Sequence, residues 1–358
     1  MWEASAPHFI QNARYECLPI HLAIAGNHSE VVKVLLPYTM NPDADPYNPK
    51  EANEINIQSD IHKSSTLEIA VQTGNIEIVK MILPRIQNPC DLQVKSGVSS
   101  IHVAAREGHT DILKLLLTFT NSSRFNERAI LDEITPLDMA AKNGHLDAVK
   151  AMTTYDVKSK TFSKKPKIPY STYLGRQCTN AFMPIYLATR NGHFEIVKYL
   201  IHCKSKYLPN DSDHFGRFNK RTPIHAAAEK GHVEILKLFI KPPYDPNVPD
   251  KNGITPIHLA VENGHLEVMK LLIKNTNYPN SPEFKNGKTP LHLAAENGHV
   301  DIIKILIKYL LKPLDNECEN PKQLAEKNGH KDIVKLFSSI KRTLNDQPEV
   351  ESKKIKML

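Results

Sequence analysis

Histidine is the residue type whose number and spacing first suggest chemistry in this sequence, because imidazole binds zinc and exchanges protons near neutral pH. The chain has 17 histidines in 358 residues. Most recur at two places of a repeated motif: His21, His102, His225, His258 and His292 in a four-residue box, and His28, His109, His145, His193, His232, His265, His299 and His330 at a corner. A zinc site needs ligands that converge on one point, whereas these histidines are spaced about one repeat apart. The sequence therefore predicts no metal site.

Other patterns of catalytic residues do not occur in the sequence. It contains no phosphate-binding loop, nucleophile elbow or dinucleotide-binding fingerprint, because its glycines are used at the corners of the motif. We therefore expect a protein that is not an enzyme, with no cofactor and no small-molecule substrate.

The cysteines and the apolar runs bear on the compartment. The five cysteines are far apart and form no CxxC pair, which favours a reducing compartment over a disulfide scaffold. Neither a signal peptide nor an apolar run of about 18 residues is visible. We expect a soluble intracellular protein without an integral membrane segment. Its expected location is the cytoplasm, and two lysine-rich tetrapeptides, 164–167 and 353–356, make the nucleus an additional candidate.

The helices that position these histidines are predicted most clearly over residues 253–273. Thr255 is a favourable N-cap and Pro256 suits the first position of a helix, where its missing N–H costs nothing. The helix is expected to end before Gly264, which can adopt the left-handed conformation of a helix end. A second helix is predicted from Leu266 to Ile273, too short to be stable alone and apolar on more than one side. Such a helix needs neighbours on both flanks.

Copies of this motif occur along nearly the whole chain. Their corner residues are Asn27, Gly74, Gly108, Gly144, Gly192, Gly231, Gly264, Gly298 and Gly329, which gives nine repeats with a base period near 33 residues. Boxes of the type Thr-Pro-Leu-His lie at 18–21, 99–102, 135–138, 183–186, 222–225, 255–258 and 289–292. With this period and this box, the sequence from residue 17 to residue 337 resembles ankyrin repeats.

The resemblance implies an all-α solenoid of helix-turn-helix repeats with projecting β-hairpin-like fingers and a concave groove. It also implies a structural role for the two recurrent histidines, which would hydrogen-bond the box threonine and backbone groups of adjacent repeats. Thr222 with His225, Thr255 with His258 and Thr289 with His292 match that arrangement.

The repeats divide the chain into segments. Residues 1–16 are a lead-in, 17–155 hold repeats one to four with an acidic insertion at 41–64, 156–180 form a basic insertion, 181–337 hold repeats five to nine, and 338–358 are a charged tail. The basic insertion is either a long loop on a continuous stack or a hinge between two blocks, and we favour the continuous stack. The tail is expected to be disordered, or to form a short extra helix followed by disorder.

The resemblance also implies a function, namely binding of a partner protein on the finger tips and the exposed face of the first helices, as a scaffold or adaptor. The candidate partner-binding residues are Phe218, Lys220, Arg221, Glu229, Lys230, Lys251, Asn252, Ile254, Glu262, Asn263, Lys285, Asn286, Lys288, Glu296 and Asn297.

Two alternatives to this function remain open from the sequence. In the first, the basic insertion binds nucleic acid or acidic lipid electrostatically, although the net charge of +7 is modest for this length and disfavours nucleic acid as a partner. In the second, the chain is the targeting portion of a larger enzyme or channel.

Overall fold

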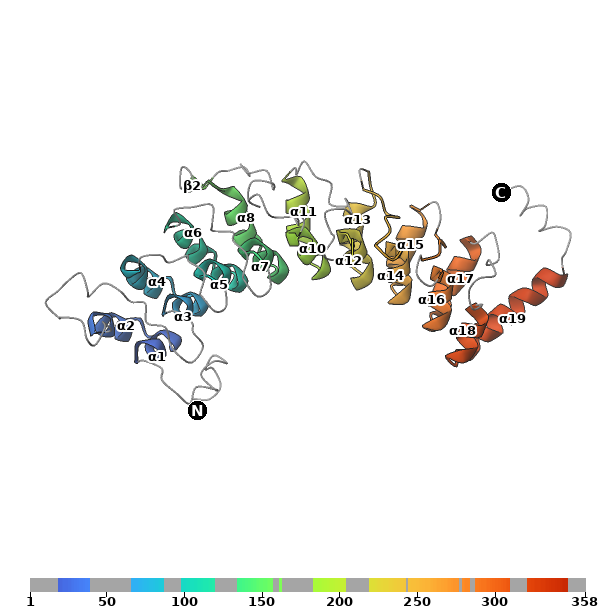
Figure 1. Ribbon diagram of the computed structural model, residues 1–358, viewed down its shortest axis with the longest axis horizontal. Coiled ribbons are helices and arrows are strands. Elements are labelled where there is room, and N and C mark those ends of the chain that lie inside the picture. The colour runs from blue at the N-terminus through green and yellow to red at the C-terminus, as the bar shows by residue number, and fades with distance from the viewer. Residues whose placement is uncertain are drawn as a thin grey trace. The chain divides into compact units, whose positions relative to one another are not determined.

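The computed structural model describes residues 19–38, 66–86, 98–119, 134–156, 161–162, 183–203, 219–242, 244–276, 279–283, 287–309 and 321–346. Two compact parts make up the chain, Met1–Cys178 and Thr179–Leu358, and in each the described residues form successive pairs of short helices (Figure 1). The expected lead-in at 1–16, the acidic insertion at 41–64 and residues 347–358 lie outside the described residues.

The N-terminal part holds the helix pairs of repeats one to four. They are α1 (Pro19–Ala25) with α2 (Ser29–Leu35), α3 (Thr66–Thr73) with α4 (Ile76–Ile82), α5 (Ser100–Glu107) with α6 (Thr110–Phe119), and α7 (Pro136–Asn143) with α8 (Leu146–Thr154). Short 3₁₀ turns, Leu36–Tyr38 and Leu83–Arg85, follow α2 and α4. First helices pack on first helices and second helices on second helices, from α1 to α7 and from α2 to α8.

A small strand pair follows repeat four. Strand β1 (Tyr155–Asp156) pairs antiparallel with β2 (Thr161–Phe162), and Tyr155 lies opposite Phe162. The side chain of Tyr155 is fully buried, and its hydroxyl donates to the carbonyl of Leu117 at 2.6 Å. The segment expected to be an irregular basic insertion from residue 156 thus begins as a strand pair anchored on α6. The rest of that insertion, 157–160 and 163–180, lies outside the described residues, so the continuous stack stays a prediction.

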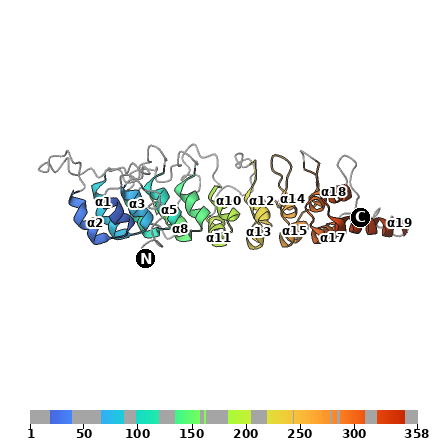
Figure 2. The ribbon, with the colours of Figure 1, turned by 90° about the horizontal axis from the view of Figure 1, so that it is seen from below.

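The C-terminal part holds repeats five to nine. Its helices are α10 (Met183–Arg190), α11 (Phe194–His202), α12 (Pro223–Lys230), α13 (Val233–Phe239), α14 (Pro256–Glu262), α15 (Leu266–Ile273), α16 (Pro290–Glu296), α17 (Val300–Tyr309), α18 (Pro321–Lys327) and α19 (Lys331–Asp346). Figure 2 shows α10, α12 and α14 in one layer of this part and α11, α13 and α15 in the other. The all-α architecture expected from the sequence is confirmed.

The helix pair of repeat seven forms for the expected local reasons. Helix α14 begins after the N-cap Thr255 with a proline in its first turn, and Gly264 just beyond its end has φ of +73°. Helix α15 buries a broad apolar face made of Val268, Met269, Leu272 and Ile273, each at most 4% exposed. Burial of such side chains contributes about 1.5–3 kcal/mol each. Because α13 and α17 pack on either side of α15, this burial depends on the neighbouring repeats.

Two details differ from the expectation. The last helix, α19, runs through Phe337 to Asp346, so the boundary between repeat nine and the charged tail falls inside a helix and the extra helix is an extension of the last one. The finger before α14 is a tight turn without strand pairing. It is closed by the N–H of Asp250 donating to the carbonyl of Ile254 at 2.8 Å, and by the N–H of Gly253 donating to the carbonyl of Asp250 at 3.1 Å.

Candidate functional site

The box histidines are buried parts of the helix caps. In repeat seven the Nδ1 of His258 accepts from the backbone N–H of Thr255 at 3.1 Å and lies 2.8 Å from its hydroxyl. The pair Thr289 and His292 repeats these contacts at 3.2 and 2.8 Å. In repeat four Asp138 replaces the histidine, and its carboxylate accepts from both groups of the N-cap threonine. These contacts confirm the expected role of the box histidine.

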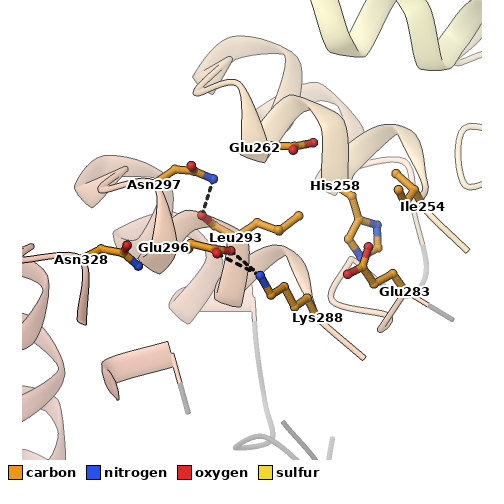
Figure 3. A pocket seen from close by; sticks show the side chains of 9 residues that line it. All are labelled: Ile254, His258, Glu262, Glu283, Lys288, Leu293, Glu296, Asn297 and Asn328. Carbon is orange, nitrogen blue, oxygen red and sulfur yellow. Dashed lines mark hydrogen bonds and ion pairs between the residues drawn. The ribbon is translucent and has the colours of Figure 1, made fainter. Parts of the chain in front are cut away.

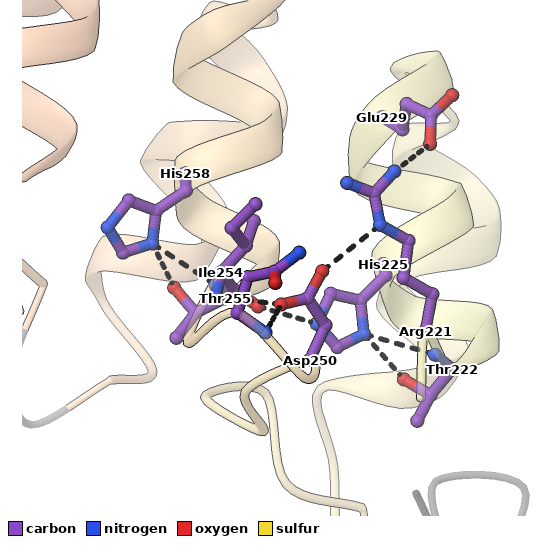
Figure 4. Close-up of polar contacts among 9 residues, drawn as sticks. Arg221, Thr222, His225, Glu229, Asp250, Ile254, Thr255 and His258 are labelled. Carbon is purple, nitrogen blue, oxygen red and sulfur yellow. Dashed lines mark hydrogen bonds and ion pairs between the residues drawn. The ribbon is translucent and has the colours of Figure 1, made fainter. Parts of the chain in front are cut away.

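In repeat six the box histidine also connects two repeats. The N–H of Thr222 donates to Nδ1 of His225 at 3.1 Å, so Nε2 carries the proton of the neutral ring. That Nε2 donates to the carbonyl of Ile254 in the next repeat at 3.0 Å (Figure 4). Burial lowers the pKa of His225 to about 4, and that of His258 to about 4 as well. Both rings are therefore neutral hydrogen-bonding groups at neutral pH.

Six corner histidines connect a repeat to the preceding one. Their Nε2 atoms lie 2.8–3.3 Å from backbone carbonyls, in the pairs His109 with Gln72, His145 with Arg106, His232 with Arg190, His265 with Glu229, His299 with Glu262, and His330 with Glu296. The joint between repeats one and two is different, because the amide of Asn75 donates to the side-chain oxygen of Asn27 at 2.6 Å. In the described part of the chain, no group of three His, Cys, Asp or Glu side chains could hold a metal ion.

The predicted partner-binding residues occupy equivalent places in successive repeats. Arg221, Ile254 and Lys288 each precede the N-cap threonine of a first helix, while Glu229, Glu262 and Glu296 lie at or near the end of the same helices. Lys230, Lys251, Glu262, Asn263 and Asn297 are exposed, and Lys220, Asn252 and Ile254 are partly exposed. Three predicted residues, Phe218, Lys285 and Asn286, lie outside the described residues.

Arg221 is held by two carboxylates of its own chain. Its Nη1 donates to Glu229 at 3.1 Å and its Nε donates to Asp250 at 3.2 Å (Figure 4). The side chain of Asp250 is fully buried, and it also accepts from the backbone N–H groups of Asn252 and Ile254 at 2.8 and 3.0 Å. Arg221 therefore ties the end of α12 to the finger of repeat seven.

We predict that Arg221→Met lowers the free energy of unfolding of the C-terminal part by about 1–2 kcal/mol, because it leaves Asp250 buried without its cation. The two backbone donors that remain limit the loss. The matched control is Lys288→Met, which breaks a more exposed ion pair with Glu296 at 2.7 Å and should cost less than about 1 kcal/mol. Urea unfolding measures both variants, and equal losses would contradict the prediction.

A cavity of about 530 Å³ lies among repeats seven, eight and nine (Figure 3). Its lining residues are Ile254, His258, Glu262, Glu283, Lys288, Leu293, Glu296, Asn297 and Asn328. Five of them, Ile254, Glu262, Lys288, Glu296 and Asn297, belong to the predicted partner-binding residues, which we call the strip, whereas the other four were missed. The place of Glu283 is clear only in the structure: its backbone N–H donates to the carbonyl of Lys288 at 3.0 Å, so it holds the finger place that Asp250 holds one repeat earlier.

The polar groups of this cavity are mostly acceptors. The amide N–H of Asn297 donates to the carbonyl of Leu293 at 3.0 Å, and that of Asn328 donates to the carbonyl of Leu324 at 2.9 Å. Each amide oxygen is thereby left as an acceptor. Three carboxylates line the same space with one ammonium group, that of Lys288, so the charge balance is negative.

The alternative site, the basic insertion, lies outside the described residues except for β1 and β2. Among the helices that the structure describes, none has the length and apolar character needed to cross a membrane.

Comparison with known proteins gives a family and two short similarities. The family described as "Ankyrin repeats (3 copies)" matches residues 4–96, 67–161, 101–211, 168–250, 185–283, 224–317 and 276–347. The chain is 38% identical over 104 residues to the nuclear factor NF-kappa-B p105 subunit of Gallus gallus, which is 29% of this chain and 10% of that protein. It is 34% identical over 98 residues to the p105 subunit of Rattus norvegicus, which is 27% of this chain and 9% of that protein. The chain thus spans about a tenth of the length of these relatives.

Proposed function

The chain belongs to the ankyrin repeat family, and we propose that it is a scaffold or adaptor without catalytic activity that binds a partner protein through repeats six to eight. Ankyrin repeats imply protein–protein interaction. The contact surface would consist of the finger bases and the ends of the first helices. We place this function in the cytoplasm or the nucleus, in line with the scattered cysteines.

The observation that carries the proposal is the position of the cavity of about 530 Å³, because five residues of the predicted strip line it. The opposite layer offers a different surface. There the exposed charges pair with one another along each second helix, as in Lys237 with Glu234 at 2.6 Å and Lys304 with Asp301 at 2.9 Å. The strip also contains ion pairs, such as Lys230 with Glu229 at 3.4 Å, but among the described residues none reaches Lys251 or Glu262. These two charges remain available to a partner.

The ordered backbone that carries the strip also supports binding. Its residues stand on short helices whose caps and joints are hydrogen-bonded, as in Thr255 with His258 and His265 with Glu229. Because the backbone is already ordered, little conformational entropy is lost when a partner binds.

We predict that a strip variant, Lys230→Glu with Lys251→Glu and Asn263→Lys, loses a captured partner protein at least about tenfold, because the changes reverse two charges of the exposed strip and add a third. The measurement is a lysate pull-down with quantitative mass spectrometry. The matched control changes the same residue types on the second-helix side, Lys237→Glu with Lys304→Glu and Asn275→Lys. Asn263 and Asn275 are comparable, because both are exposed and both donate to a backbone carbonyl, at 2.8 and 2.7 Å.

Two outcomes would contradict the proposal: equal loss in the strip and control variants, or retention of every partner in both. Salt distinguishes the electrostatic alternative. A nucleic-acid binder would lose affinity about 10³-fold or more between about 50 and 200 mM salt, because binding releases counterions. A protein interface on the strip should change far less.

A further inference from the structure

Repeat six shows how this fold holds a guanidinium group. Arg221 lies between Glu229, at the end of its own first helix, and Asp250, in the finger of the next repeat. The two carboxylates come from consecutive repeats, and the arginine spans the groove between them with two donor atoms at 3.1 and 3.2 Å. The side chain of Arg221 is 27% exposed, so the site is open to solvent on one side.

Repeat seven keeps both carboxylates of this arrangement but not the cation. Glu262 ends helix α14 as Glu229 lies near the end of α12, and Glu283 takes the finger place of Asp250. The residue before the N-cap threonine is Ile254, which carries no charge. The same two carboxylate places are thus present one repeat later without an arginine from the chain itself.

The carboxylate of Glu283 is unusual in its surroundings. The residue is only 8% exposed, and among the described residues no hydrogen bond or ion pair reaches its side chain. Glu262 likewise has no side-chain partner among them, and Lys288 pairs with Glu296 at 2.7 Å. The carboxylates of Glu262 and Glu283 thus line one cavity without an ion pair to a described residue, which favours a cation supplied from outside.

The shape of the cavity agrees with this requirement. Ile254 and Leu293 provide apolar wall for an aliphatic stem, while Glu262, Glu283 and the amide oxygen of Asn297 provide acceptors for its head (Figure 3). A volume of about 530 Å³ also leaves room for chain that flanks such a side chain.

We propose that repeat seven binds an arginine side chain of the partner protein between Glu262 and Glu283, as Arg221 is bound between the corresponding carboxylates of repeat six. The proposal rests on the proposed protein-binding function and names the chemistry of the partner. Arginine fits better than lysine, because a planar guanidinium has five donors and can reach two carboxylates, whereas an ammonium is a compact and more strongly hydrated charge.

The first test uses fluorescein-labelled nine-residue peptide pools with a fixed central residue and mixed uncharged flanks. The central residue is arginine, citrulline or lysine, and citrulline has the shape of arginine without its charge. Fluorescence polarisation with the full chain should show at least about tenfold tighter binding of the arginine pool than of either other pool. Equal binding of arginine and citrulline, or of arginine and lysine, would overturn the proposal.

Variants locate the effect. Glu283→Gln should reduce the arginine preference about tenfold. Glu262→Gln, at an exposed position, should also reduce it, and it provides the test if circular dichroism shows that Glu283→Gln is not fully folded. Glu267→Gln is the matched control, because Glu267 lies on the second helix of the same repeat and is exposed. An undiminished preference in folded Glu283→Gln, or in Glu262→Gln, would refute the site.

The chain can also supply the cation itself. Ile254→Arg places a guanidinium where repeat six has Arg221, so it should abolish binding of the arginine pool and raise the thermal midpoint by about 2–4 °C. Ile254→Gln, of similar length without charge, should do neither. If Ile254→Arg leaves peptide binding intact, the two carboxylates do not form the proposed site.

The peptide assay and the pull-down can fail separately, because the strip variant changes neither Glu262 nor Glu283. If the strip variant loses its partner but the arginine pool shows no preference, the binding function stands and the arginine site is wrong. If the pool binds through Glu283 but the partner does not depend on the strip, the arginine site stands and the strip is wrong.

Discussion

Gly264→Ala is expected to lower the free energy of unfolding of the C-terminal part by about 2–3 kcal/mol. Gly264 has φ of +73°, where an alanine costs about 1–2 kcal/mol. A Cβ there would lie 2.8 Å from the Cε1 atom of His299, so the ring must move. That ring's Nε2 lies 3.2 Å from the carbonyl of Glu262, and losing this hydrogen bond adds about 1 kcal/mol.

The chain offers its own control for this prediction. Gly329 has nearly the same backbone conformation, φ of +78°, but nothing lies within 4 Å of a Cβ placed there. Gly329→Ala should therefore cost only the backbone term of about 1–2 kcal/mol. In a His299→Ala background the cost of Gly264→Ala should fall to that of Gly329→Ala, which a double-mutant cycle by urea unfolding measures. Strictly additive effects would show that the glycine and the histidine are independent.

Acidification is expected to destabilise the C-terminal part by about 4 kcal/mol between pH 7.5 and pH 5. Burial lowers the pKa values of His225 and His258 to about 4, whereas an unfolded histidine titrates near 6.5. In that interval the unfolded state binds more protons, so stability is full above about pH 6.5 and falls as the pH falls toward 4. Each ring contributes about 2 kcal/mol of the loss at pH 5.

The measurement is the urea midpoint at several pH values above 5, where ordinary carboxylates stay ionised. The control carries His225→Asn and His258→Asn, whose amide oxygens can still accept from the N-cap N–H. It should be less stable at pH 7.5 but show a flatter pH profile. If the urea midpoint of the control depends on pH as steeply as that of the natural chain, other groups cause the acid sensitivity.

The helices were predictable because their signals are local. Thr255, Pro256 and Gly264 mark both ends of α14 within ten residues, and the structure places the helix between them. The end of α19 was not predictable from the repeat pattern, because the helix continues past Phe337 without a change of conformation. The strand pair at Tyr155 was missed for a related reason: its anchor is the carbonyl of Leu117, 38 residues earlier.

The candidate site was predictable only in part, because a repeat pattern gives positions and not pairings. It placed Arg221, Glu262 and Lys288 on one strip, but it could not tell that Arg221 is already bound to a buried aspartate from the next finger. Glu283 escaped notice because its burial arises from the packing of three repeats around one cavity. Aligning the fingers on their shared Lys-Asn-Gly and N-cap threonine would not recover it, because one extra residue then places Phe284 opposite Asp250.

The joints between repeats bear on how such an array can lengthen during evolution. Each glycine–histidine joint is shared, with the glycine in one repeat and the histidine in the next, as in Gly264 with His299. A duplicated repeat inserted between two such neighbours carries both a corner glycine and a corner histidine. Its histidine can contact the glycine of the preceding repeat, and its glycine can accommodate the histidine of the following repeat. The first repeat instead joins the second through Asn27 and Asn75, a pair that no histidine-bearing neighbour would complete. Gene duplication can thus extend the interior of this array, while its first repeat stays tied to its present neighbour.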